Sequence, residues 1–119
     1  MAVMTFEIED GFKVGETTHK EIGLRELTPK DVFEAQLASE KIGMINNRPY
    51  AYTSDIQMGM ELLCRQVDYI GTIQGPISIK ELLKLSAKDF ALLQQKSSEL
   101  DNVIFPHEVM EEVEARGRD

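Results

Sequence analysis

The chain has 119 residues, with 21 Asp and Glu against 13 Lys and Arg, which gives a formal net charge of −8. Hydrophobic residues make up 42% and charged residues 29%, a balance typical of a globular protein rather than a disordered one, and the length suits a single domain, 1–119. Its Lys and Arg residues are scattered among acids, and an acidic chain repels nucleic acid and anionic membrane surfaces, so both are excluded as partners.

Residues 1–27 are predicted to form a β-hairpin. Polar and apolar residues alternate here, with Phe6 and Ile8 on one side. Asp10-Gly11 is a turn signal, but the polar run Gly15–His19 could instead be the true loop. A hairpin alone is marginal in water, so this one must pack on the helices or on a partner chain.

The first helix has a well-defined start. Thr28 can cap it, Pro29 fits the first helical position, and Asp31 places negative charge in the first turn. We expect the helix to end before Gly43 and a loop to follow over residues 44–52, because two asparagines and a proline interrupt the periodicity there.

A second helix is predicted from Thr53 or Ser54 to Gly71. One apolar stripe at spacings of four and three residues supports it, and we interpret the stripe as core: Ile56, Met60, Leu63, Val67 and Ile70. A short helix over Ile77–Leu85 should follow.

The next helix should begin after Ser86 and end at Asp101-Asn102. Residues 102–119 are then expected to form a short C-terminal helix with a frayed end. That helix has Val109, Met110 and Val113 on one side and is too short to be stable unless it docks.

The two helix starts resemble each other. The run Glu26–Phe33 and the run Lys84–Ala91 both place a leucine, a hydroxyl residue and an aspartate at the same spacing. A cap, a preceding apolar residue and an acidic first turn explain this similarity without a shared function.

No residue pattern points to catalysis, a cofactor or a metal. His19 and His107 have no Cys, His or acidic partner at metal-ligand spacing. The single cysteine, Cys64, lies among apolar residues and suits a core position in a reducing cytoplasm. We therefore predict a protein that is not an enzyme, although carboxylates brought together by the fold remain the alternative. There is neither a signal-peptide pattern nor an apolar stretch that could cross a bilayer.

These elements predict an α+β fold in which an N-terminal β-hairpin, 1–27, packs on a helical body of four to five helices, 28–101, with 102–119 as the C-terminal segment. The alternative is a mostly all-α fold.

Three runs carry a resemblance to a known family: Ile22-Gly23-Leu24-Arg25-Glu26-Leu27-Thr28-Pro29-Lys30-Asp31, Val67-Asp68-Tyr69-Ile70-Gly71 and Leu82-Leu83-Lys84-Leu85-Ser86-Ala87-Lys88-Asp89-Phe90. Their order and spacing over residues 20–101 resemble the short tail assembly chaperones of Mu-like contractile-tailed phages and prophages.

This resemblance implies a non-enzymatic chaperone that binds the tape measure protein and helps recruit tail tube protein. Such proteins act in the host cytoplasm, are absent from the mature virion, and often have a longer form made by ribosomal frameshifting. The candidate partner-binding residues lie on the N-terminal hairpin and the last helix: Phe6, Ile8, Val109, Met110 and Val113. The alternatives are a structural connector that stays in the particle and a small regulatory protein-binding module; an enzyme ranks last.

Overall fold

The N-terminal hairpin consists of strand β1 (Met4–Val14) and strand β2 (Thr17–Leu24) in the computed structural model, which describes residues 1–104. The hairpin turns at Gly15 and Glu16, and Gly15 has the positive φ of 62° that such a tight turn requires. The predicted hairpin is therefore confirmed, and the turn lies at the start of the polar run rather than at Asp10-Gly11.

Asp10 and Gly11 instead lie in a bulge of β1. Glu7 pairs with Glu21 and Phe12 with His19, so four residues of β1 face the single Lys20 of β2. The extra residues have no partners in the ladder, and Gly11 takes a φ of 91° within the bulge. The bulge returns Phe12 to the core side, where it is buried.

A four-stranded antiparallel sheet forms in the order β1-β2-β5-β6. Strand β5 (Val67–Ile70) and strand β6 (Ile73–Gln74) follow helix α2 (Asp55–Gln66). The prediction that this helix continues to Gly71 was wrong, because the edge of β2 offers backbone partners to a segment whose Val67 and Ile70 are fully buried.

The other helices are α1 (Pro29–Ala38), α3 (Ile79–Leu82) and α4 (Ala87–Ile104). The predicted start of α1 is confirmed, with Thr28 forming a capping box with Asp31. Helix α4 passes through Asp101 instead of ending there, since Leu100 continues its buried stripe. Helix α3 is shorter than predicted. Of the segment 102–119 that was predicted as a short C-terminal helix, residues 102–104 belong to α4 and the rest lies outside the described residues.

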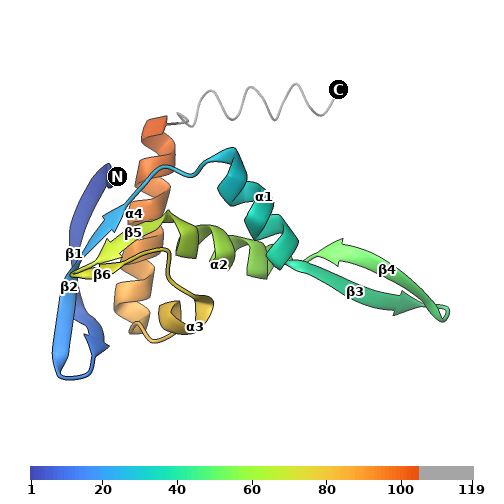
Figure 1. Cartoon of the computed structure of the whole chain (residues 1–119), viewed down its shortest axis with the longest axis horizontal. Helices are drawn as coiled ribbons and strands as arrows, with labels where there is room; N and C mark the ends of the chain where they lie inside the picture. Colours follow the sequence, from blue (N-terminus) through green and yellow to red (C-terminus); the bar gives the residue numbers. More distant parts are fainter. Residues whose placement is uncertain (105–119) are drawn as a thin grey trace.

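The prediction of a loop over residues 44–52 was also wrong. Strand β3 (Glu40–Ile45) and strand β4 (Arg48–Thr53) form a second hairpin that projects away from the body (Figure 1). Asn46 and Asn47 form its two-residue turn with φ values of 51° and 63°, and asparagine tolerates this conformation better than most residues.

The hydrophobic core lies between the four-stranded sheet and helices α2, α3 and α4 (Figure 1). Its fully buried members include Ile22, Leu24, Val67, Ile70, Leu82 and Leu93. The α+β class is thus confirmed, although the body over residues 28–101 contains four strands as well as helices. The radius of gyration is 16.7 Å. It exceeds the value of about 13.5 Å for a compact chain of this length, as expected when one hairpin projects from the body.

Candidate protein-interaction surface

The β3–β4 hairpin is exposed to an unusual degree. Every residue of the two strands is exposed except Gly43, which is half-buried. Ile42 is 77% exposed and Met44 62%, although apolar side chains on a strand usually face a core. An isolated two-stranded hairpin is marginal in water, so this one should gain stability when a further surface covers it.

The strand register gives the hairpin two different faces. Residues directly opposite each other share a face, so the pairs Ile42–Ala51 and Met44–Pro49 form one apolar face. The other face has two tyrosines, Tyr50 and Tyr52, whose ring centroids are 5.6 Å apart. The Tyr50 ring lies over Gly43, where a Cβ atom would be 2.5 Å from it.

The apolar face continues onto helix α1. Phe33 and Leu37 are 63% and 55% exposed. They line a hollow of about 180 Å³ together with Glu40 and Thr53. Since Glu40 and Thr53 pair with each other two positions from Ile42 and Ala51, they lie at the base of the same hairpin face. We call this continuous region the arm surface: Phe33, Leu37, Ile42, Met44, Pro49 and Ala51.

The base of the hairpin is firmly attached to the body. The Ser54 amide donates to the Ser39 carbonyl at 2.9 Å, and the buried Ser39 hydroxyl donates to the Ala35 carbonyl at 2.7 Å. The Gln57 side-chain amide donates to the Ala38 carbonyl at 2.7 Å. These bonds join the residue before β3 to the residue after β4, and the end of α1 to the start of α2, so the body holds the base of the hairpin in place.

The β3–β4 hairpin also differs in charge from the rest of the chain. Strands β3 and β4 contain Lys41 and Arg48 as cations and Glu40 as the single anion, whereas the whole chain has a net charge of −8. An apolar arm on an acidic body combines a contact surface with a body that resists non-specific association.

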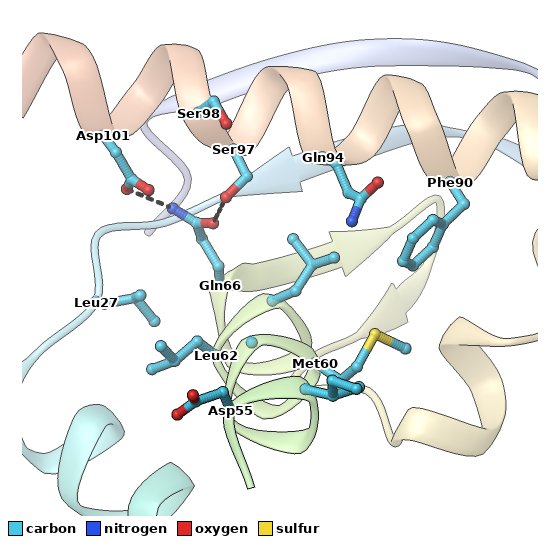
Figure 2. Close-up of a pocket in the computed structure, with 13 residues that line it drawn as sticks. Leu27, Asp55, Met60, Leu62, Gln66, Phe90, Gln94, Ser97, Ser98 and Asp101 are labelled. Carbon is cyan, nitrogen blue, oxygen red and sulfur yellow. Dashed lines mark hydrogen bonds between the residues drawn. The ribbon is translucent and has the colours of Figure 1, made fainter.

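A second hollow, of about 510 Å³, lies between α2 and α4 (Figure 2). Met60 and Phe90 line its apolar end, and Gln66, Ser97 and Asp101 its polar end. The Gln66 amide donates to Asp101 at 3.5 Å and accepts from the Ser97 hydroxyl. Partial desolvation raises the pKa of Asp101, and the bond from Gln66 opposes this. These polar groups bind one another rather than facing the hollow unpaired.

The sequence-predicted partner residues have different locations. Ile8 is 2% exposed in the core, and Phe6 is partly buried against it. Val109, Met110 and Val113 lie outside the described residues, so their role in partner binding stays a prediction.

The arm surface was missed by sequence reasoning, although a signal for it exists. Asn46-Asn47 separates two runs of strand-forming residues, one of them the alternating Tyr50-Ala51-Tyr52. Two residues with a tendency to positive φ between such runs are typical of a β-hairpin.

The cysteine and the histidines were the candidates for catalysis or metal binding. Cys64 is 1% exposed, and burial raises the pKa of its thiol to about 11, which suits the predicted core role. His19 lies on β2 and pairs with Phe12, and His107 lies outside the described residues. Among residues 1–104 no cluster of three or more His, Cys, Asp or Glu side chains is arranged to hold a metal ion. None of the helices described here is both long and apolar enough to span a membrane.

Comparison with known proteins gives a consistent family. A family model described as "Tail assembly protein gp41" matches residues 8–118. The "Probable tail assembly protein gp41" of Escherichia phage Mu is 36% identical over 102 residues, which cover 82% of this chain and 71% of that protein. The "Probable tail assembly protein FS-gp41" of the same phage is 36% identical over 102 residues, covering 82% of this chain but 54% of that protein.

A bacterial relative matches as well. The "Mu-like prophage FluMu protein gp41" of Haemophilus influenzae is 36% identical over 87 residues, covering 72% of this chain and 68% of that protein. No solved structure matches the chain.

Proposed function

The chain belongs to the Mu gp41 tail assembly protein family, and we propose that it is a non-enzymatic chaperone that binds the tape measure protein during tail morphogenesis. Family membership supports a role in phage tail assembly. The proposal adds the partner and the mode of action: reversible binding of the tape measure protein, followed by recruitment of tail tube protein in the host cytoplasm, with the chaperone absent from the finished virion.

The arm surface is the observation that carries the proposal. A chaperone of this kind needs accessible apolar area on a body that stays in solution. Six neighbouring exposed residues of α1, β3 and β4 provide this area in a chain of net charge −8. An apolar helix face can lie on such a surface without a deep pocket, and a shallow contact allows later displacement by tail tube protein.

Coexpression with the tape measure protein of the same phage tests the proposal. We expect the chain to co-purify with the tape measure protein and to raise its soluble fraction. Phe33→Ser combined with Met44→Ser should remove most of this effect, because it replaces two exposed apolar contacts without touching the core. The matched control is Leu83→Ser, since Leu83 is 66% exposed, close to the 63% of Phe33, but lies at the end of α3.

The coexpression experiment tests the function and the contact surface separately. If the unmodified chain neither co-purifies with the tape measure protein nor keeps it soluble, the proposed function is wrong. If the control variant loses the effect as fully as the arm variant, the arm surface is not the contact.

We propose the C-terminal segment as a second contact, from the sequence alone. Replacing Val109, Met110 and Val113 by serine should lower the soluble fraction of the tape measure protein if this segment contributes. The control replaces Glu108, Glu112 and Glu114 by glutamine, on the opposite side of the predicted helix.

The alternative from a different class is a connector that stays in the particle. Mass spectrometry of purified virions decides between the two, since abundant chain in the particle favours the connector. A longer frameshifted form is part of the proposal too, and the 54% coverage of the FS-gp41 relative supports looking for a product longer than 119 residues.

A further inference from the structure

The two edges of the β3–β4 hairpin differ in their free backbone groups. Hydrogen-bonded and non-hydrogen-bonded pairs alternate along an antiparallel ladder. The bond from Ser54 to Ser39 makes the pair just below the hairpin hydrogen-bonded, so the next pair, Glu40–Thr53, is non-hydrogen-bonded. By the same alternation, Ile42–Ala51 and Met44–Pro49 are also non-hydrogen-bonded pairs. Proline fits this phase because it cannot donate a ladder bond.

In the non-hydrogen-bonded pairs, the backbone N–H and C=O groups point outward from the hairpin. The β4 edge lacks one of these donors because Pro49 has no N–H. The β3 edge has all of its donors and acceptors, from Glu40, Ile42 and Met44. In the described part of the chain β3 pairs with β4 alone. Proteins usually protect open strand edges with proline, charge or a covering element. Pro49 protects the β4 edge, whereas within residues 1–104 no proline and no second strand protects the β3 edge.

We propose that β3 pairs with β3 of a second copy of this chain, antiparallel and about a twofold axis. The product is a continuous sheet in the order β4-β3-β3-β4. This inference goes beyond the proposed function, because it concerns self-association and needs no tape measure protein.

The open backbone groups select one register. With Ile42 opposite Ile42 of the second copy, Glu40 faces Met44, and all the outward groups of the three residues find partners. A register centred on Gly43 leaves Glu40 opposite the Asn46 turn, and one centred on Lys41 places two lysines opposite each other, which is destabilising.

Side chains on both faces suit the register centred on Ile42. On the aromatic face, Lys41 lies opposite Gly43 of the second copy, which that copy's Tyr50 ring covers, so a cation–π contact can form. On the apolar face, Ile42 meets Ile42. The two arm surfaces then form one wider apolar platform.

Cross-linking of single cysteine variants tests the pairing. In the proposed sheet the Ile42→Cys positions of two copies lie about 5 Å apart, whereas the Ala51→Cys positions are separated by three strand spacings, about 14 Å. A thiol cross-linker with a reach between these distances should give covalent dimer with Ile42→Cys and little with Ala51→Cys. Both positions are exposed, and native Cys64 is buried, so it adds no background. Equal cross-linking of the two variants would overturn the proposal.

Proline substitution at each edge gives an independent readout by light scattering coupled to gel filtration. The unmodified chain should be a dimer. Met44→Pro removes an outward N–H of β3 and should give a monomer, while Ala51→Pro makes the same change on β4 and should remain a dimer. Neither change removes a bond within the hairpin. An unmodified chain that is monomeric at every concentration, or dimers lost equally in both variants, would disprove pairing through β3.

A folding control separates the loss of the dimer from unfolding of a proline variant. The core lies outside the hairpin, so the urea midpoint of the body should match in both variants and report that each is folded.

Discussion

The carboxylate of Asp89 accepts a hydrogen bond from the backbone amide of Gly11 at 2.9 Å, although the residues are 78 positions apart. The same carboxylate accepts from the amides of Glu9 at 2.8 Å and Asp10 at 3.1 Å. These are the bulge residues of β1 that have no partner in the ladder, so one fully buried side chain at the start of α4 satisfies the defect in the sheet.

Replacing Asp89 should therefore destabilise the fold strongly. Asp89→Ala removes the charged acceptor that the three bulge amides share, and we expect a loss of about 2–4 kcal/mol in the free energy of unfolding. Asp89→Asn keeps the shape but turns one acceptor into a donor, so it should lose a similar amount. Urea denaturation measures both. Asp10→Asn, at an exposed side chain in the same bulge, is the control and should change stability by less than about 0.5 kcal/mol. A mild effect of both Asp89 variants would contradict this role.

Asp31, in the first turn of α1, should make the stability of the fold depend on acid pH. The Arg25 guanidinium donates to Asp31 at 2.7 and 2.8 Å, and this bond, with help from Thr28, holds the pKa of Asp31 well below its ordinary range. The folded state thus favours the carboxylate. Its contribution is fully present above the unfolded pKa of about 3.9 and is lost as the pH falls below it.

Comparison of the unmodified chain with Asp31→Asn isolates this effect. The difference in free energy of unfolding should be constant above about pH 5 and shrink as the pH falls from about 4 towards 2. Urea titrations at a series of pH values measure it. A difference that stays the same down to pH 2 would show that the Arg25 bond does not favour the charged form.

Cys64 should be unreactive in the folded chain. It is 1% exposed with a pKa raised to about 11, so both access and thiolate are lacking at pH 8. We expect a thiol reagent to label it only after unfolding, with labelling following the urea transition. Rapid labelling without denaturant would mean that the contact between α2 and the core opens locally.

Local signals explain which elements could be predicted. The α1 start combines Thr28, Pro29 and Asp31 within four residues, and the structure has that cap. The helix predicted through Val67 to Gly71 failed because the last two apolar positions of its stripe, Val67 and Ile70, are buried equally well in a short strand, and only the distant edge of β2 decides between the two structures. Likewise, nothing near Asp89 in the sequence indicates that its carboxylate closes a bulge in β1.

For the arm surface, too, the sequence predicts the local structure but not its surroundings. Its hairpin could have been predicted from Asn46-Asn47, but its exposure could not, because Ile42 and Met44 have the composition of buried strand residues. Whether an apolar strand is covered depends on the space left by the rest of the fold.

The turn residues give a way to vary the arm surface without touching the body. Asn47→Gly should stabilise the hairpin, because asparagine followed by glycine suits two successive positive φ values, while Asn47→Val should loosen it. Hydrogen exchange should therefore slow at the β3 and β4 amides in the glycine variant and quicken in the valine variant, with the exchange of Ile22 and Leu24 in the core unchanged. Tape measure solubilisation should rise and fall in the same order, since an ordered arm costs less to bind. If exchange changes as expected and solubilisation does not, the hairpin is a separate element from the tape measure contact.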